Sequence, residues 1–389
     1  MKYRRIFLIL FLILTGCSSR QPSNSALDDI IPGNPVTLQK GCGDGICDGP
    51  ETTSTCPEDC QTIQAAAPSS TSEIPPLYFF YTIHAHGSDE FLPYTGPAKN
   101  EIDSEAAENM IAAIDGIAEV LDKYGVKGTW EFLPATVEGL QAYQGKDHIF
   151  GQLLANGHEI GVHTHKLEDI APAVEALQSM GISPITTSGF LAQVSKVGAG
   201  DVQAAMSLAI QIPVEKGLTV GTANLSPGGD MNTISSACQN VLGVGNDMWQ
   251  ETGNLMFPWR PDYLHQDICT HNPQGELLII DHVSIEWVIL PEEGRAADVV
   301  DTRHFNQLKD KFEAAIMYME EKQPDHPAAW GFVTHVIEYA VGGKAENPPL
   351  PESLAALDEF LSYVDIKHQE GQVIYATSGE IAEIVASQE

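Results

Sequence analysis

From about residue 77 to the end of the chain, short apolar runs alternate with longer segments in which apolar residues recur at helical spacing. The short runs are rich in aliphatic, β-branched and aromatic residues, which predicts buried strands. Met110, Ile111, Ile114 and Leu121 fall on one face of the first predicted helix. The predicted strands cover residues 76–86, 125–134, 157–165, 182–190, 218–224, 276–285, 330–337 and 372–378, and further helices cover 301–322 and 351–368.

This alternation predicts an α/β protein with a parallel sheet. About eight strand–helix repeats over roughly 310 residues suit a distorted (β/α)7-8 barrel. In such barrels the chemistry gathers at the C-terminal ends of the strands. We therefore expect the functional residues at those strand ends within a single domain, residues 77–389.

The first 76 residues have a different composition. Lys2, Arg4 and Arg5 precede an apolar run, Ile6 to Leu14, which is too short to span a bilayer and is typical of a signal peptide. The run ends in "LTGC", which resembles the lipobox of bacterial lipoproteins, where the cysteine, here Cys17, is lipidated. An uncleaved anchor is the alternative. Both readings imply a cell-envelope protein that is tethered to a membrane and faces the periplasm or exterior. The expected segments are a signal peptide (1–16), a lipidated tether (17–40), a Cys-rich repeat (41–60) and a linker (61–76).

Six cysteines remain besides the lipobox cysteine, and an even number in an exported protein suggests three disulfides. Four of them lie in the repeat and must pair among themselves, which leaves Cys238 to pair with Cys269. The four are Cys42, Cys47, Cys56 and Cys60.

The Cys-rich unit, "CGDGICDGPETTSTCPEDC", resembles a short repeat found beside exported prokaryotic domains. Its acidic residues are oxygen ligands of the kind that calcium accepts. The alternatives are a disulfide-stapled spacer with solvated acids and a zinc site of four thiolates, which the oxidising compartment disfavours.

The formal net charge is −33, from 20 basic and 53 acidic residues. Such a field repels phosphate backbones and argues against a nucleic-acid partner. A hydrophobic content of 43% is ordinary for a globular protein with a sizeable core.

Histidines provide the strongest chemical signal. His84 and His86 end the first predicted strand two residues apart, so both point to one face, and His163 and His165 repeat this at the third. His335 ends the strand "WGFVTH". Neutral imidazoles are good zinc ligands, and hydrolytic metal sites use three protein ligands and an open position. The pattern predicts one divalent metal ion, most plausibly zinc; the alternative is a set of hydrogen-bonded core histidines.

Five stretches resemble, in order, the motifs of the polysaccharide deacetylase (NodB-homology) family, from Leu77 to about Glu383. They are "GVKGTWEF", "NGHEIGVHTH", "WRPDY", "WGFVTH" and "GQVIYATSGEIAEI". The resemblance implies a distorted (β/α) barrel and metal-dependent removal of acetyl groups from N- or O-acetylated sugars. It further implies that His163 is a metal ligand, that Arg260 orients the catalytic carboxylate, and that His335 is the general acid.

The first motif departs from the family, which has "TFDDG" where this chain has "TIHAHGSDE". Alignment on the glycine places His86 at the ligand position, and alignment on the threonine places His84 at the base. The second histidine of the next motif is replaced by Leu167, and His165 offers a substitute. The expected ligands are therefore His84, His86, His163 and His165.

The sequence does not identify the general base, because the aspartate pair of the family's first motif is missing. Glu131, in "TWEF", is the first candidate. The other candidates are Asp89, Glu90, Asp281 and Glu286.

The leading expectation is a metal-dependent carbohydrate deacetylase. One alternative is a glycosidase of a related barrel family, which needs two carboxylates about 5–10 Å apart. The other is a degenerate barrel that binds sugar or metal without turnover, an idea that the missing aspartate pair favours.

Overall fold

A computed structural model of the chain describes residues 76–86, 104–144, 148–191, 202–223, 252, 254–265, 267–285, 299–344 and 347–389. The signal peptide, Cys17, the Cys-rich repeat and the linker lie outside the described residues, as do Cys238 and the side chain of Cys269. The lipid anchor, the disulfides and the calcium site therefore stay predictions.

The strands are β1 (Leu77–Ala85), β2 (Gly128–Phe132), β3 (Glu159–His163), β4 (Thr186–Ser188), β5 (Val220–Ala223), β6 (Pro261–Asp262), β7 (Asp267–His271), β8 (Leu278–Asp281), β9 (Val283–Ser284), β10 (Ala328–His335) and β11 (Val373–Tyr375). The α-helices are α1 (Ser104–Lys123), α2 (Pro134–Gln144), α3 (Ile149–Ala155), α4 (Ile170–Ser179), α5 (Val202–Glu215), α8 (Thr302–Lys322), α9 (Pro351–Gln369) and α10 (Ser378–Ala386). Every predicted strand overlaps an observed one.

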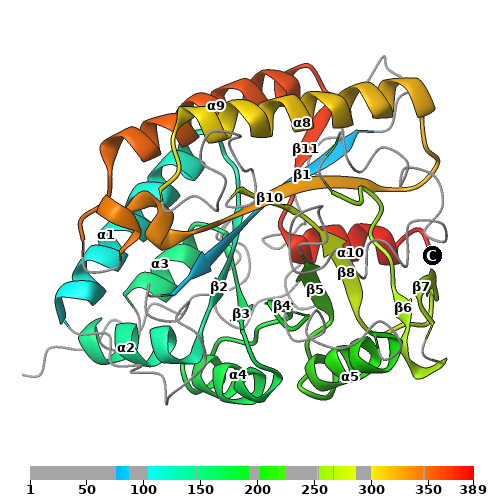
Figure 1. Cartoon of the computed structure of the whole chain (residues 1–389), viewed down its shortest axis with the longest axis horizontal. Coiled ribbons are helices and arrows are strands. Elements are labelled where there is room, and N and C mark those ends of the chain that lie inside the picture. Colours follow the sequence, from blue (N-terminus) through cyan, green and yellow to red (C-terminus); the bar gives the residue numbers. More distant parts are fainter. Residues whose placement is uncertain are drawn as a thin grey trace, which may run out of the picture. The chain divides into compact units, whose positions relative to one another are not determined.

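The main sheet is parallel and nearly closed, which confirms the predicted distorted barrel (Figure 1). Its strands follow the order β8-β5-β4-β3-β2-β1-β10-β9, and β11 pairs with the start of β1. The two strands at the ends of this row, β8 and β9, are consecutive in the chain and separated only by His282. The sheet therefore closes on itself through this segment.

The inside of the barrel changes from apolar to polar along the strands. At the N-terminal end, Phe80, Val220 and Leu278 pack together and against Ile381 and Val385 of α10, which fills that end. Further along β1, the residues on the inner face are a threonine and then a histidine, because alternate residues of a strand share a face. The apolar end thus supports a polar site at the other end.

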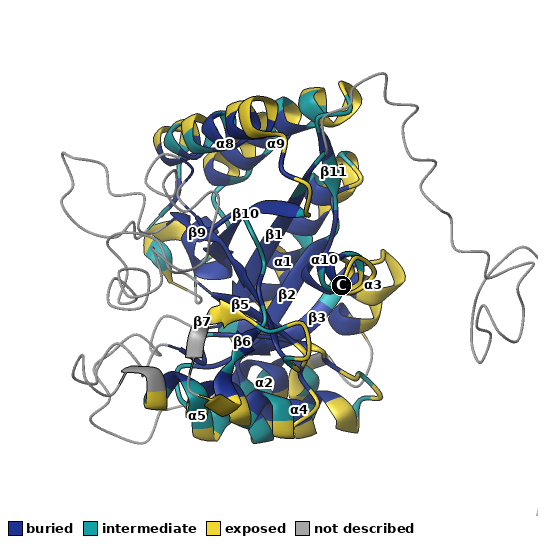
Figure 2. Cartoon of the chain, turned by 90° about the vertical axis from the view of Figure 1, so that its right-hand side faces the viewer, coloured by how far each residue is buried: buried dark blue, intermediate teal, exposed yellow. Residues whose placement is uncertain are grey.

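A second apolar layer lies between the strands and the surrounding helices, whose outer faces are exposed (Figure 2). The face of α1 that the spacing predicts, including Ile114, Ile117 and Leu121, is buried there. Asp301 caps α8 by accepting a hydrogen bond from Arg303 N. In the described part of the chain, none of the helices combines the length and apolarity needed to cross a bilayer.

Candidate metal centre

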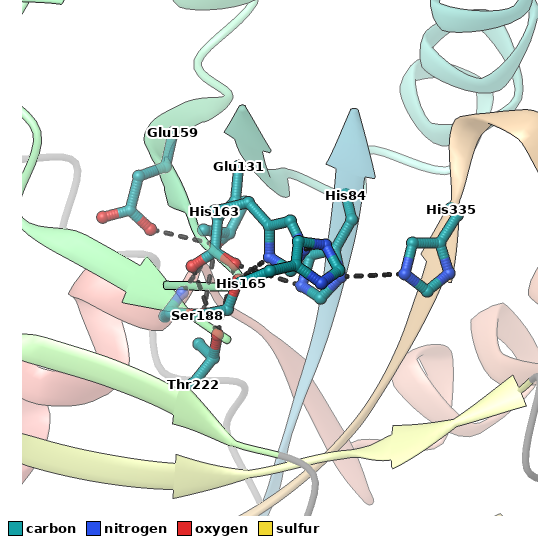
Figure 3. Close-up of polar contacts among 10 residues, drawn as sticks. His84, Glu131, Glu159, His163, His165, Ser188, Thr222 and His335 are labelled. Carbon is teal, nitrogen blue, oxygen red and sulfur yellow. Dashed lines mark hydrogen bonds and ion pairs between the residues drawn. The ribbon is translucent and has the colours of Figure 1, made fainter. Parts of the chain in front are cut away.

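The histidines identified from the sequence lie at the C-terminal ends of neighbouring strands. His84, near the end of β1, is aligned with His335 on β10 and, on its other side, with Glu131 on β2. His163 ends β3 and is aligned with Ser188, the last residue of β4. Because parallel barrel strands end at one rim, residues distant in the sequence meet there. Figure 3 shows these side chains converging.

Four histidines form a compact group, the imidazole cluster: His84, His86, His163 and His335. One ring nitrogen from each lies within 4.8 Å of the corresponding nitrogens of the other three. The His84 and His163 rings stack with centroids 3.9 Å apart, and His86 stacks on His163 at 5.1 Å. All four residues are buried. A group of imidazoles is a donor set that suits zinc and similar borderline ions.

Two rings of the cluster are also hydrogen-bonded from outside through their second nitrogen, and a third ring lies beside a carboxylate. Nε2 of His84 lies 3.3 Å from Oε2 of Glu131. Nδ1 of His163 lies 2.7 Å from the hydroxyl oxygen of Ser188. Nδ1 of His335 lies 3.1 Å from a carboxylate oxygen of Glu338, in the 3₁₀ turn that follows β10. Histidines that bind metals are typically held in this way.

Burial keeps two rings of the cluster, those of His84 and His163, uncharged. The pKa of His84 and the pKa of His163 lie well below the usual histidine value, first because burial disfavours the charged ring and then because other imidazoles are close. A neutral imidazole keeps a lone pair for a metal ion. The ring nitrogens on the inside of the cluster converge, and ring nitrogens on its outside contact hydrogen-bond acceptors. Both features fit a divalent ion such as zinc.

Glu131 lies beside the cluster in the wall of the barrel. It is fully buried, and this burial raises its pKa to about 8, although hydrogen bonds from Ser188 and Thr222 oppose the shift. The Thr222 hydroxyl donates to both carboxylate oxygens, at 3.2 and 3.3 Å. Glu131 therefore contacts a histidine and two hydroxyls, which differs from the expected position of an accessible base.

Two predicted site residues are not part of the four-histidine group in the described structure. His165 is half-buried, and its Nε2 lies 2.9 Å from Nε2 of His163; in the described structure His335 completes the four-histidine set in its place. The Nε of Arg260 donates to Glu389 at 3.0 Å. Glu389 follows α10, on the side of the molecule away from the arrowhead of β1 (Figure 1). The described structure pairs Arg260 with Glu389, and its role in orienting a catalytic carboxylate stays a prediction.

Of the remaining candidates for the base, Asp281 alone lies among the described residues. Asp281 accepts a hydrogen bond from Leu255 N at 2.6 Å and so ties a neighbouring segment to the end of β8. Asp89, Glu90 and Glu286 lie outside the described residues. The two carboxylates beside the cluster, those of Glu131 and Glu338, each contact a histidine, an arrangement that does not favour the glycosidase alternative.

The sequence did not single out His282, Glu338, Ser188 or Thr222. His282 follows β8, and its ring centroid lies 6.2 Å from that of His84. Burial first, and then His335, lowers the pKa of His282 to about 3. The available signal was position alone, since Ser188, Thr222 and His282 each lie inside a predicted strand and stand at or next to the end of the observed strand.

The first histidine of "NGHEIGVHTH" has a structural role. Nδ1 of His158 accepts a hydrogen bond from Gly128 N at 2.9 Å and thereby joins the starts of β3 and β2. The next residue, Glu159, accepts hydrogen bonds from Thr129 and from Gly379 N, which anchors the start of α10. The segment "NGHEIGVHTH" thus joins two strands, holds the start of α10 and supplies a histidine of the site.

Acid is expected to destabilise the fold partly through His158. Burial lowers the pKa of this ring to about 4, below the usual histidine value of 6.5. A depressed folded-state pKa gives stability that is complete above pH 6.5 and is lost as the pH falls toward 4, on the order of 3 kcal/mol for this residue. Urea unfolding at pH 7, 5 and 4 measures the loss. His158→Asn, which retains an acceptor, should show a shallower loss; equal pH dependence in both proteins would contradict the assignment.

No known protein-family model matches the chain, and no curated protein matches it. Similar solved structures include a protein assigned as a polysaccharide deacetylase from Mycobacterium smegmatis, with 14% identity, 82% of this chain and 93% of that chain covered, and a TM-score of 0.49. A second, from Pseudomonas aeruginosa PAO1, has 13% identity, 79% and 90% coverage and a TM-score of 0.47. Puue allantoinase has 12% identity, 82% and 93% coverage and a TM-score of 0.47. Over most of its length the chain is thus similar to structures assigned as polysaccharide deacetylases, the family that its sequence motifs resemble.

Proposed function

We propose that this protein is a metal-dependent hydrolase that removes acetyl groups from a carbohydrate, as a divergent member of the polysaccharide deacetylase family. The observation that carries the proposal is the buried imidazole cluster at the C-terminal rim of the barrel. The motif order along residues 77–383 supports the same assignment.

His84, His86 and His163 would hold the metal ion. His84 lies on β1, His86 directly follows it and His163 ends β3; Nε2 of His84 lies 3.3 Å from Glu131, and Nδ1 of His163 is hydrogen-bonded to Ser188. Three protein ligands and an open position are typical of hydrolytic zinc sites. A divalent ion bound there supplies Lewis-acid chemistry, because it polarises a carbonyl oxygen and makes water a better nucleophile at neutral pH.

His335 and Glu338 would carry the proton. The Nδ1–H of His335 donates to Glu338, which leaves Nε2 directed at the cluster, 3.3 Å from Nδ1 of His84. When water attacks the acetyl carbonyl, Nε2 would take up the proton that the water releases, and the carboxylate would stabilise the doubly protonated ring. Nε2 would then give this proton to the departing amine or alcohol. This pairing supports the general-acid role of His335 that the family resemblance implies.

The proposal includes a location in the cell envelope. It rests on the N-terminal sequence alone, in which a short apolar run leads to a lipobox-like "LTGC". A lipid on Cys17 would hold the barrel near envelope or extracellular polysaccharide, the proposed substrate class.

Acetate release tests the proposed reaction. The full chain, reconstituted with zinc, is expected to release acetate from N-acetylated chito-oligosaccharides or from O-acetylated xylan, to lose this activity on chelation, and to regain it with zinc. Acetate is measured by NMR together with the sugar product. A zinc-loaded protein that releases no acetate from either substrate contradicts the proposal, and shortened sugar chains would favour the glycosidase alternative.

A further inference from the structure

Three buried polar side chains meet behind the imidazole cluster and form what we call the carboxylate bracket: Glu131 on β2, Ser188 on β4 and Thr222 on β5. Each is at most 1% exposed. The Thr222 hydroxyl donates to both oxygens of Glu131, and the Ser188 hydroxyl also bonds to this carboxylate (Figure 3). Three separate strands thus contribute to one polar unit.

The bracket contacts two histidines of the cluster, each through one ring nitrogen. Glu131 lies 3.3 Å from Nε2 of His84, and Ser188 lies 2.7 Å from Nδ1 of His163. An imidazole has only two nitrogens. When an acceptor contacts one of them, the other nitrogen points away from that acceptor. The nitrogens left to face the site are Nδ1 of His84 and Nε2 of His163.

Ser188 extends the influence of the carboxylate to the second histidine. Nδ1–H of His163 donates to the serine oxygen, whose own O–H donates to Glu131. One carboxylate therefore lies beside two imidazoles from different strands, 3.3 Å from the ring of His84 and linked through a hydroxyl to His163.

The space for Glu131 is closely fitted. Gly161 on β3 is the neighbour of Glu131 on β2. A Cβ at this position would collide with the Thr186 hydroxyl and would lie 3.0 Å from Cγ of Glu131. The Glu131 carboxylate is tightly packed, and its oxygens contact Thr222, Ser188 and His84. We therefore expect it to affect the site by orienting the histidine rings beside it.

We propose that Glu131 is a positioning residue, and that the carboxylate bracket gives the site its metal affinity by fixing the tautomers and orientations of His84 and His163. This inference rests on the proposed metal-dependent function, and it replaces the general-base role expected for Glu131. A positioning role and a base role predict opposite results for metal affinity and turnover.

Glu131→Gln in the full chain separates the two roles. The bracket predicts zinc binding about 10–100-fold weaker, measured by competition with a chromophoric chelator, because outer partners of ligating histidines have effects of this size. It also predicts a changed Co²⁺ absorption spectrum and, at saturating metal, a kcat within about tenfold of the wild type. Unchanged zinc affinity together with a kcat loss above about 10²-fold, the range of a lost general base, would overturn the proposal.

A milder pair of variants tests the bracket without changing a charge. Thr222→Val keeps the shape of the side chain but removes the hydroxyl, and is expected to weaken zinc binding several-fold. Thr222→Ser keeps the hydroxyl and should restore most of the affinity. Equal zinc affinity in both variants and the wild type would count against the bracket.

Glu159→Gln provides the matched control. This carboxylate is also largely buried and lies on the adjacent strand, but it bonds to Thr129 and Gly379 instead of to histidines. Its zinc affinity should stay at the wild-type value while the melting temperature falls. A wild type that binds no zinc overturns both the function and the bracket. A wild type and Glu131→Gln that bind zinc equally overturn the bracket alone.

Discussion

Alanine at His163 is expected to abolish both zinc binding and acetate release, whereas alanine at His335 is expected to abolish acetate release alone. His163 stacks between two other rings of the cluster and is held by Ser188, as a ligand would be. Losing a ligand removes several kcal/mol of transition-state stabilisation, so kcat/KM should fall by more than about 10³-fold. Losing a general acid costs about 10²–10⁴-fold and leaves the metal in place.

Metal content by mass spectrometry and initial rates of acetate release together check this prediction. His158→Ala is the matched control, because it removes a buried histidine from the same segment that contacts Gly128 instead of the cluster. It should lower stability yet leave the folded protein zinc-loaded and active. If His335→Ala loses zinc as well as activity, His335 is a fourth ligand and the proton must be carried by another group.

Much of the fold could be predicted because the barrel strands are short, buried and separated by turn residues. The segment 276–285 shows the limit, since it reads as one strand but divides at His282 into β8 and β9, which pair with β5 and β10. That division closes the barrel and depends on partners remote in the sequence. Short helices such as α3, with seven residues, were missed because they hold too few turns for a periodic pattern.

The histidines of the site could be predicted because spacing two at a strand end is a local property. The residues that hold them could not. Ser188 and Thr222 carry hydroxyls that are common in strands, and they matter only because cross-strand register places them beside His163 and Glu131. Arg260 shows the converse: a local motif resembled the family, while the described structure pairs the side chain with Glu389. Local pattern thus identifies possible ligands, and tertiary register decides their partners.

Zinc is expected to stabilise the folded protein strongly, and this result separates a metal centre from a packed core of histidines. An ion that binds only the native state at about 1,000 times its Kd adds about 4 kcal/mol to the free energy of unfolding. For a domain of this size, that should raise the melting temperature by on the order of 10 °C. Magnesium and calcium prefer oxygen ligands and should have little effect at the same concentration.

Differential scanning fluorimetry with metal-free protein, titrated with zinc, magnesium or calcium, measures these shifts. His163→Ala should lose most of the zinc shift, while Glu159→Gln, with a lower starting temperature, should keep all of it. An unchanged melting temperature in zinc would mean that the stacked rings of His84, His86 and His163 satisfy one another as core residues. In that case burial alone, through its lowering of the pKa of His84 and of His163, would account for the whole cluster, and the hydrolase proposal would lose the observation that carries it.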